Sequence, residues 1–127
     1  MKTKYKIFLA KTLSKLLTTF ISKNQTVVRN KINWNLDLDE GIDLSVFLFG
    51  TSERKILNLK KLLSKKNNSL TIIDIGANIG SVSLLLAKTF ENSKIFAIEP
   101  TNYAFNKLSN NLKLNKELEK EVFLRQL

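Results

Sequence analysis

Two glycines and a distant glutamate fall where a ligand containing a nucleoside could be bound. The segment Asp74-Ile-Gly76-Ala-Asn78-Ile-Gly80 lies between an apolar run that suits a buried strand and a run that suits a helix. Glycine has no Cβ and therefore permits tight turns and close approach of the backbone to a ligand. Glu99 follows nineteen residues after Gly80, at the end of a second apolar run. A carboxylate at this place in dinucleotide-binding folds accepts hydrogen bonds from ribose hydroxyls, so the spacing predicts a ribose at Glu99.

The same loop bears on the identity of the nucleoside ligand. A dinucleotide-binding loop has the pattern G-x-G-x-x-G, and its second glycine lets the backbone approach the pyrophosphate. Aligned on Gly76, this sequence has Asn78 at that position. The asparagine counts against NAD or FAD and does not count against a nucleoside without phosphate. A dinucleotide-dependent oxidoreductase remains a competing hypothesis, which a measured preference for NAD would favour.

The elements around the loop alternate between strand and helix. Short apolar runs at 70–75, 94–98 and 122–127 predict strands, and residues 81–90 and 103–114 predict the helices between them. This β-α-β-α-β order is that of an α/β fold with a doubly wound parallel sheet. Because the first run is nearly continuous in apolar residues, it predicts a strand buried on both faces.

The residues before this alternation predict a different organisation. Residues 5–22 have the apolar spacing of an amphipathic helix, and 26–34 and 42–49 suit two strands joined by the acidic turn D-L-D-E-G. A further helix is expected at about 53–65. The predicted parts of the chain are a basic amphipathic helix, a β-hairpin and the N-terminal half of an α/β domain, over residues 1–25, 26–50 and 51–127.

Composition excludes several classes of site. The 127 residues contain no Cys and no His, so disulfides, Cys/His zinc sites and His-containing catalytic triads are excluded, and no metal site is predicted. No apolar run approaches the roughly 20 residues that span a bilayer. The N-terminus also lacks the continuous apolar core of a secretory signal. We therefore expect a cytoplasmic protein.

Positive charge is concentrated at the start of the chain. Residues 1–36 hold eight Lys and Arg residues and no acid, within a formal net charge of +10. A third hypothesis is therefore a non-enzymatic module that binds an anionic surface through its basic N-terminal helix. A weak contact with a membrane surface is left open. Specific nucleic-acid binding is not expected, because Phe8, Phe20 and Trp34 do not form an evident stacking platform. Co-sedimentation with liposomes or nucleic acid that disappears on deletion of residues 1–25 would support the module.

Several blocks of the sequence together resemble one enzyme family. The run D-I-G-A-N-I-G is followed by S-V-S-L-L-L-A-K, I-F-A-I-E-P and N-K-L-S-N-N-L-K-L-N, and is preceded by G-T-S-E-R-K-I-L-N-L-K-K-L-L. These blocks resemble the FkbM family of S-adenosylmethionine-dependent methyltransferases over roughly residues 50–115. The resemblance implies methyl transfer from S-adenosylmethionine to an oxygen of a sugar or another small metabolite. It also implies that the cofactor is bound at the methionine end by Asp74 and Gly76, in the loop by Ala77, Asn78 and Gly80, at the ribose by Glu99 and beside the adenine by Pro100.

The resemblance also sets an expectation for the fold. Members have a Rossmann-like class I methyltransferase fold with about seven strands, in which the central strands follow the order 3-2-1-4-5. Only three parallel strands are predicted here, so we expect a truncated domain, preceded by the amphipathic helix and the hairpin. The strand at Leu70–Ile75 would then be an exposed apolar edge, and the chain alone would be unstable or inactive. The catalytic base and the acceptor pocket would lie elsewhere, and no catalytic residue is assigned.

Overall fold

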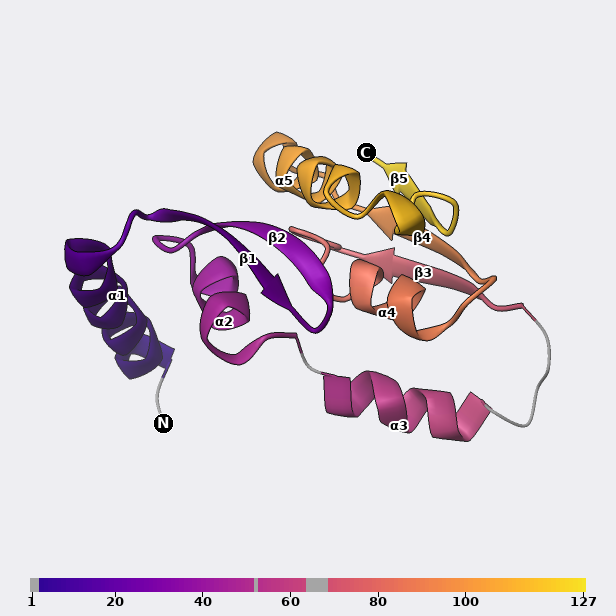
Figure 1. Ribbon diagram of the computed structural model, residues 1–127, viewed down its shortest axis with the longest axis horizontal. Coiled ribbons are helices and arrows are strands. Elements are labelled where there is room, and N and C mark those ends of the chain that lie inside the picture. Colours follow the sequence, from indigo (N-terminus) through magenta and orange to yellow (C-terminus); the bar gives the residue numbers. More distant parts are fainter. Residues whose placement is uncertain (1–2, 52, 64–68) are drawn as a thin grey trace.

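The computed structural model describes residues 3–51, 53–63 and 69–127, in which an N-terminal hairpin and several helices lie beside a small parallel sheet (Figure 1). The first helix, α1, lies at the end of the molecule opposite the sheet. The elements in chain order are α1 (Thr3–Phe20), β1 (Asn24–Arg29), β2 (Ile32–Asp37), α2 (Gly41–Phe49), α3 (Glu53–Leu63), β3 (Thr71–Ile75), α4 (Ser83–Thr89), β4 (Lys94–Ile98), α5 (Asn102–Lys113), the 3₁₀ helix η1 (Lys116–Leu118) and β5 (Val122–Arg125).

The three strands predicted in the second half of the chain form a parallel sheet in the order β3-β4-β5. Ile73 lies beside Phe96 in β4, and Phe96 lies beside Phe123 in β5. The two helices predicted between these strands are α4 and α5. The predicted alternation and the predicted position of β3 at an edge of the sheet are therefore confirmed. The predicted helix at 53–65 is α3, and its expected end lies outside the described residues.

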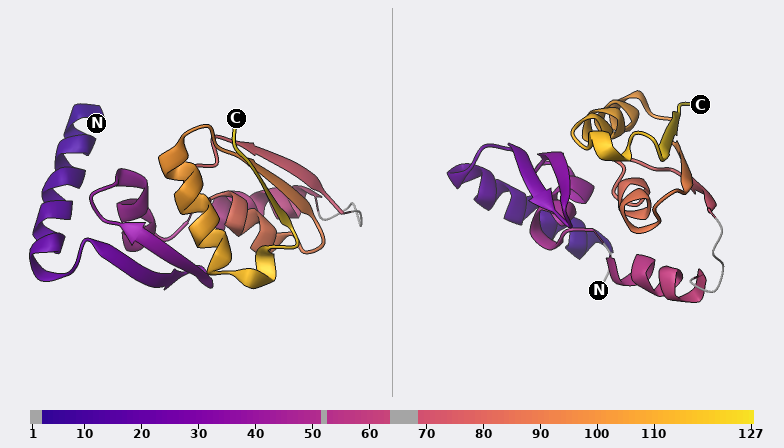
Figure 2. Two further views of the ribbon diagram at one scale, coloured as in Figure 1. Left: turned by 90° about the horizontal axis from the view of Figure 1, so that it is seen from above. Right: turned by 45° about the vertical axis from the view of Figure 1, so that its right-hand side comes forward.

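One face of this sheet is covered and the other is not. The right-hand view of Figure 2 shows α4 and α5 on the same side of the strands. On the opposite face, Ile73 and Ile75 of β3 are 61% and 80% exposed, and the rings of Phe96 and Phe123 stack with centroids 5.3 Å apart. The prediction that the first strand is buried on both faces is wrong for the described residues. The apolar residues of β3 pack into a core on one face of the sheet only.

The predicted hairpin is present, but it is built from other residues than expected. The segment 26–34, predicted as one strand, contains the turn between β1 and β2, which pair antiparallel. Asn30 and Lys31 have φ angles of 55° and 58°, the left-handed values that a type I′ hairpin turn requires at both central residues. The Asn30 side chain accepts hydrogen bonds from the backbone N–H and the hydroxyl of Thr51, at 2.7 and 2.9 Å. These bonds anchor the turn.

The segment 42–49, predicted as the second strand of the hairpin, is the helix α2. Its first turn begins where the acidic turn was expected, with the N–H of Leu44 bonded to the carbonyl of Glu40 at 2.9 Å. Asp43 is almost fully buried, accepts the N–H of Asp37 at 2.7 Å and forms an ion pair with Lys107 of α5. Periodicity alone does not distinguish helix from strand in a short apolar run. In the helix that is observed, Asp43 reaches both Asp37 and the distant Lys107.

The hairpin and the sheet share one hydrophobic core. Trp34 of β2, Leu84 of α4, Ile95 of β4 and Leu108 of α5 have no exposed surface and belong to the same buried cluster. The Trp34 indole N–H donates to the carbonyl of Arg29 at 3.2 Å, so its polar atom is satisfied within the hairpin. The hairpin is therefore packed as part of the α/β domain.

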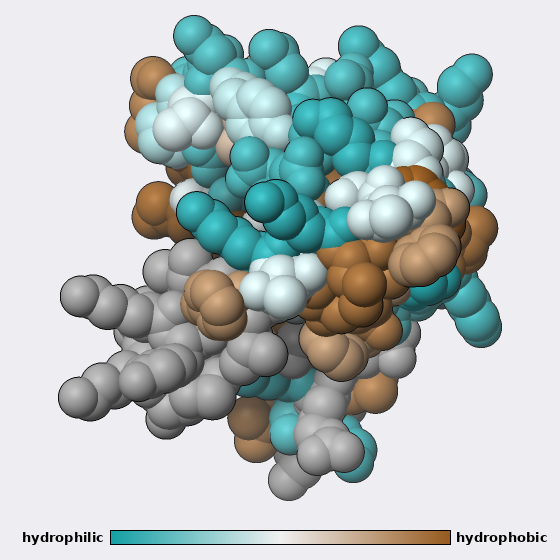
Figure 3. Space-filling view, turned by 90° about the vertical axis from the view of Figure 1, so that its left-hand side faces the viewer, coloured by the Kyte–Doolittle hydropathy of each residue, from teal (hydrophilic) through white to brown (hydrophobic). Residues whose placement is uncertain are grey.

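The helix α1 contacts α2 and leaves apolar side chains in solvent. Phe8, Leu16 and Phe20 are exposed, and Figure 3 shows apolar surface beside a hydrophilic area on this end of the molecule. Among residues 3–51, 53–63 and 69–127, no helix combines the length and the apolar character that crossing a bilayer requires.

We predict that the same substitution on the two faces of the sheet has very different effects on stability. Ile73→Thr should change the free energy of unfolding by less than about 1 kcal/mol, because this side chain is largely in solvent. Ile95→Thr should lower it by about 2–4 kcal/mol, because it removes apolar atoms from the core and buries a hydroxyl. Threonine keeps the β-branched shape in both variants. Urea unfolding measures the difference, and equal losses would show that the exposed face is packed in solution.

Candidate functional site

The glycine loop follows β3 and has a left-handed backbone at three positions. Gly76, Asn78 and Gly80 have φ angles of 77°, 50° and 91°. The N–H groups of Gly76 and Ala77 both donate to the carbonyl of Ile98, at 2.9 and 3.0 Å, so the loop begins at the carboxyl end of β4. In open parallel sheets this end of the strands is where ligands bind.

The two glycines of the loop have different surroundings. A Cβ at Gly76 would meet nothing within 4 Å, so the backbone there faces open space. A Cβ at Gly80 would lie 2.6 Å from the Leu108 side chain and 3.3 Å from that of Leu84. The structure therefore explains Gly80 by close packing of the loop on α5, and it leaves Gly76 as the glycine that a ligand could approach.

Glu99 meets the loop directly. Its Oε2 accepts the N–H of Asn78 at 3.0 Å, and its Oε1 accepts the N–H and the hydroxyl of Thr101 at 2.9 and 2.6 Å. The side chain is 5% exposed. The hydroxyl and the N–H of Thr101 lower the pKa of Glu99 below its usual value, with help from the N–H of Asn78, while burial acts in the opposite direction. The carboxylate is thus charged near neutral pH and bound to the loop.

Asp74, Ala77 and Pro100 complete the set of residues predicted at the site. Asp74, at the end of β3, accepts the hydroxyl of Ser83 at 2.6 Å, which links the strand to the first turn of α4. Ala77 is buried and its carbonyl accepts the N–H of Gly80 at 2.9 Å. Pro100 is exposed beyond Glu99. The predicted residues therefore gather around the carboxyl ends of β3 and β4.

A cleft lies beside this group. Its volume is about 350 Å³, and it includes Asn78 and Thr101, which are both bonded to Glu99. Its other side is formed by the start of α2. The residues that line it are Glu40, Gly41, Ile42, Asp43, Asn78, Ile79, Thr101, Tyr103 and Ala104.

Charged and aromatic groups at one wall of the cleft are tied together. Lys107 of α5 pairs with the buried Asp43, and its ammonium lies 5.7 Å from the centre of the Tyr103 ring. Burial lowers the pKa of Lys107, against the effect of the carboxylates of Asp37 and Glu40. Burial also raises the pKa of Tyr103. Because Asp43 already pairs with Lys107, we treat this pair as a link between α2 and α5.

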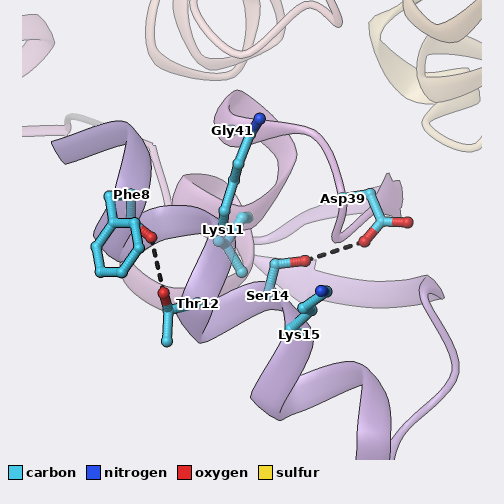
Figure 4. Close-up of a pocket in the computed structure, with 8 residues that line it drawn as sticks. Phe8, Lys11, Thr12, Ser14, Lys15, Asp39 and Gly41 are labelled. Atoms are coloured by element: carbon cyan, nitrogen blue, oxygen red, sulfur yellow. Dashed lines mark hydrogen bonds between the residues drawn. The ribbon is translucent and has the colours of Figure 1, made fainter. Parts of the chain in front are cut away.

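Two further cavities lie at α1 and contain none of the predicted site residues. The larger, of about 700 Å³, lies between α1 and the turn before α2, where the hydroxyl of Ser14 donates to Asp39 at 3.0 Å (Figure 4). The second, of about 370 Å³, is an apolar groove between α1 and α2. The larger is lined by the polar side chains of Lys11, Thr12, Ser14, Lys15 and Asp39, and it lies apart from the glycine loop and Glu99.

Sequence reasoning missed three residues that shape the site. Thr101 and Ser83 bond the two predicted carboxylates, and Asn111 of α5 bonds the loop carbonyl of Ile79 at 3.0 Å. A hydroxyl two residues after Glu99 was the signal available for Thr101. Nothing local marks Asn111, since its partners lie far away in the sequence.

The chain resembles a known protein over part of its sequence. No protein-family profile matches the chain. Methyltransferase SdnD of Sordaria araneosa is 45% identical over 47 residues, which are 37% of this chain and 18% of that protein. The match is thus a partial one, and the FkbM assignment remains a prediction.

Solved structures share the fold at low sequence identity. A methyltransferase from Agrobacterium tumefaciens, described as SAM-dependent, matches with a TM-score of 0.61 and 11% identity, over 82% of this chain and 32% of its own. TYW2 from M. jannaschii, solved in complex with AdoMet, matches with a TM-score of 0.55 and 24% identity, over 84% of this chain and 44% of its own. The chain thus spans less than half of each of these proteins. It has the Rossmann-like α/β fold of S-adenosylmethionine-dependent methyltransferases, as the sequence predicted.

We predict that Glu99 makes stability depend on pH. Its hydrogen bonds hold the folded-state pKa below the unfolded value of about 4.3. Their contribution is therefore fully present above about pH 5 and is lost as the pH falls through the folded-state pKa. Glu99→Gln should unfold more easily than the parent at pH 7, with a smaller difference near pH 3. Urea unfolding at both pH values tests this, with Glu91→Gln as an exposed control. A gap between parent and Glu99→Gln that does not narrow at low pH would contradict it.

Proposed function

We propose that this chain belongs to an S-adenosylmethionine-dependent methyltransferase and forms its cofactor-binding part. The observation that carries the proposal is the 3.0 Å hydrogen bond between the N–H of Asn78 and the carboxylate of Glu99. This bond places Glu99, which follows β4, against the glycine loop, which follows β3. An adenosine ribose needs both a carboxylate and an approachable backbone at this place.

The conformation of Asn78 supports this cofactor over a dinucleotide. Its N–H is bonded to Glu99, and its side-chain oxygen accepts the N–H of Ile79 at 2.8 Å. A dinucleotide-binding loop has a glycine here so that the pyrophosphate can approach the backbone. In this chain a side chain occupies that place and stabilises the left-handed turn itself. S-adenosylmethionine has no phosphate and makes no such demand.

Each residue then has a defined role toward the cofactor. The carboxylate of Glu99 has about four lone-pair positions, and three described donors use it, so capacity remains for a ribose hydroxyl. Gly76 allows close approach, because open space lies where a side chain would be. Asp74 uses Oδ2 for Ser83, and its other oxygen would meet the ammonium at the methionine end. Pro100 would border the adenine.

The proposed reaction is methyl transfer to an oxygen of a sugar or another small metabolite, as in the FkbM family. S-adenosylmethionine would supply an electrophilic methyl group to the acceptor oxygen and leave as S-adenosylhomocysteine, and the acceptor hydroxyl would give its proton to a base. The contribution of the residues named here is to orient the cofactor in a near-attack geometry. We assign no catalytic base among them.

We predict that the 127-residue chain binds S-adenosylhomocysteine and S-adenosylmethionine more tightly than NAD in titration calorimetry. Glu99→Gln should weaken S-adenosylhomocysteine binding 10- to 100-fold, since a hydrogen bond to a charged group contributes about 1.5–3 kcal/mol. Glu91→Gln removes an exposed carboxylate between α4 and β4 and should bind like the parent. Tighter binding of NAD, or equal affinity of the two variants, would contradict the proposal.

A further inference from the structure

A single buried side chain connects the glycine loop to the N-terminal hairpin. Asn111 of α5 has no exposed surface. Its Nδ2 donates to the carbonyl of Ile79 in the loop at 3.0 Å, and its Oδ1 accepts the N–H of Asn35 in β2 at 2.8 Å. The two ends of one amide group thus bind two segments that are far apart in the sequence.

A second asparagine repeats the contact with the hairpin one turn later. The Oδ1 of Asn115 accepts the N–H of Asn33 at 2.8 Å, and its Nδ2 donates to the carbonyl of Asn33 at 2.8 Å. It also donates to the carbonyl of Asn111 at 2.7 Å, which links the two asparagines. Asn115 has no exposed surface, and none of its described hydrogen bonds goes to the loop.

The spacing of the two pairs fits the geometry of helix and strand. Four residues of an α-helix rise by about 6 Å, and two residues of a strand rise by about 6.6 Å. The side chains of Asn111, on α5, and of Asn115, just beyond its C-terminal end, therefore meet backbone groups two residues apart on β2. The edge of β2 that faces away from β1 is thus bonded to amide side chains where a further strand would otherwise lie.

We propose that Asn111 is a positioning residue, which fixes the cofactor loop at Ile79 against the edge of β2. Ile79 lies between Asn78, which contacts Glu99, and Gly80, which packs on Leu108. Displacement of the Ile79 carbonyl would move the adjacent Asn78, whose N–H bonds Glu99 at the proposed ribose site. The consequence for cofactor affinity rests on the proposed function, whereas the effect on the loop does not.

The contact made by the Asn111 side-chain oxygen and the contact made by its side-chain nitrogen can be separated by a nearly isosteric substitution. Asn111→Asp keeps an oxygen for the N–H of Asn35, but it loses the donor to Ile79 and places a carboxylate oxygen against that carbonyl. Asn115→Asp makes the same chemical change one turn away, where the lost donor served the hairpin and α5 only. Asn110→Asp adds the same charge at an exposed position of the same helix.

We expect Asn111→Asp to speed amide hydrogen exchange at Asn78, Ile79 and Gly80 at least tenfold more than Asn115→Asp does, measured by NMR on the 127-residue chain at pH 7. Asn110→Asp should leave these rates unchanged. S-adenosylhomocysteine binding should weaken about tenfold in Asn111→Asp and less in Asn115→Asp. Loop exchange equal in the Asn111 and Asn115 variants would overturn the inference.

Two further outcomes are distinguishable from this one. If the parent chain binds no S-adenosylhomocysteine, the proposed function fails, and the exchange rates of the loop still decide the role of Asn111. If Asn111→Asp does not fold, the parent protein gives the answer, because a scalar coupling across the hydrogen bond between the Asn111 amide nitrogen and the Ile79 carbonyl is expected. Rapid exchange of that side-chain amide with solvent, without the coupling, would overturn the inference.

Discussion

The buried carboxylate of Glu99 is the constraint on which the site depends. Burying a charged group is unfavourable unless hydrogen bonds replace its hydration. Here the replacements come from the N–H of Asn78 and from the N–H and hydroxyl of Thr101, while the N–H of Glu99 itself bonds the carbonyl of Arg125 in β5. The need to solvate one charge therefore brings together the glycine loop, the start of α5 and the adjacent strand. A residue without charge at 99 would not impose this arrangement.

The loop is consequently held from two directions. The sheet holds it through the Ile98 carbonyl and the carboxylate of Glu99, and α5 holds it through the amide of Asn111 and the packing of Leu108 against Gly80. A loop fixed in this way loses little conformational freedom when a ligand binds, which favours affinity. This also gives the hairpin a part in the site although it lies outside the α/β alternation, because Asn111 bonds β2 with the same side chain.

How much of this arrangement could be predicted from the sequence depends on where the partners of each residue lie. The strand at 94–98 was predicted with its observed bounds, because an apolar run between two helical segments is a local signal. The helix α2 was not, because the ion pair of its Asp43 is with Lys107, 64 residues later. The hairpin turn was missed for the same reason, since Asn30 is anchored by Thr51, 21 residues away. Local sequence patterns were enough to predict most strands and helices. The elements that were predicted wrongly are those with polar contacts to distant residues.

The uncovered face of the sheet and the site are independent in physical terms. The exposed side chains of Ile73 and Ile75 point to the face opposite the helices, whereas the described hydrogen bonds to the loop come from the end of β4 and from α5. Asp74 alternates with these two isoleucines along β3 and bonds Ser83 of α4, on the covered side. Contacts made on the exposed apolar face would therefore leave the geometry of the loop unchanged. The loop and Glu99 are thus organised by the helices and the hairpin on one side of the sheet.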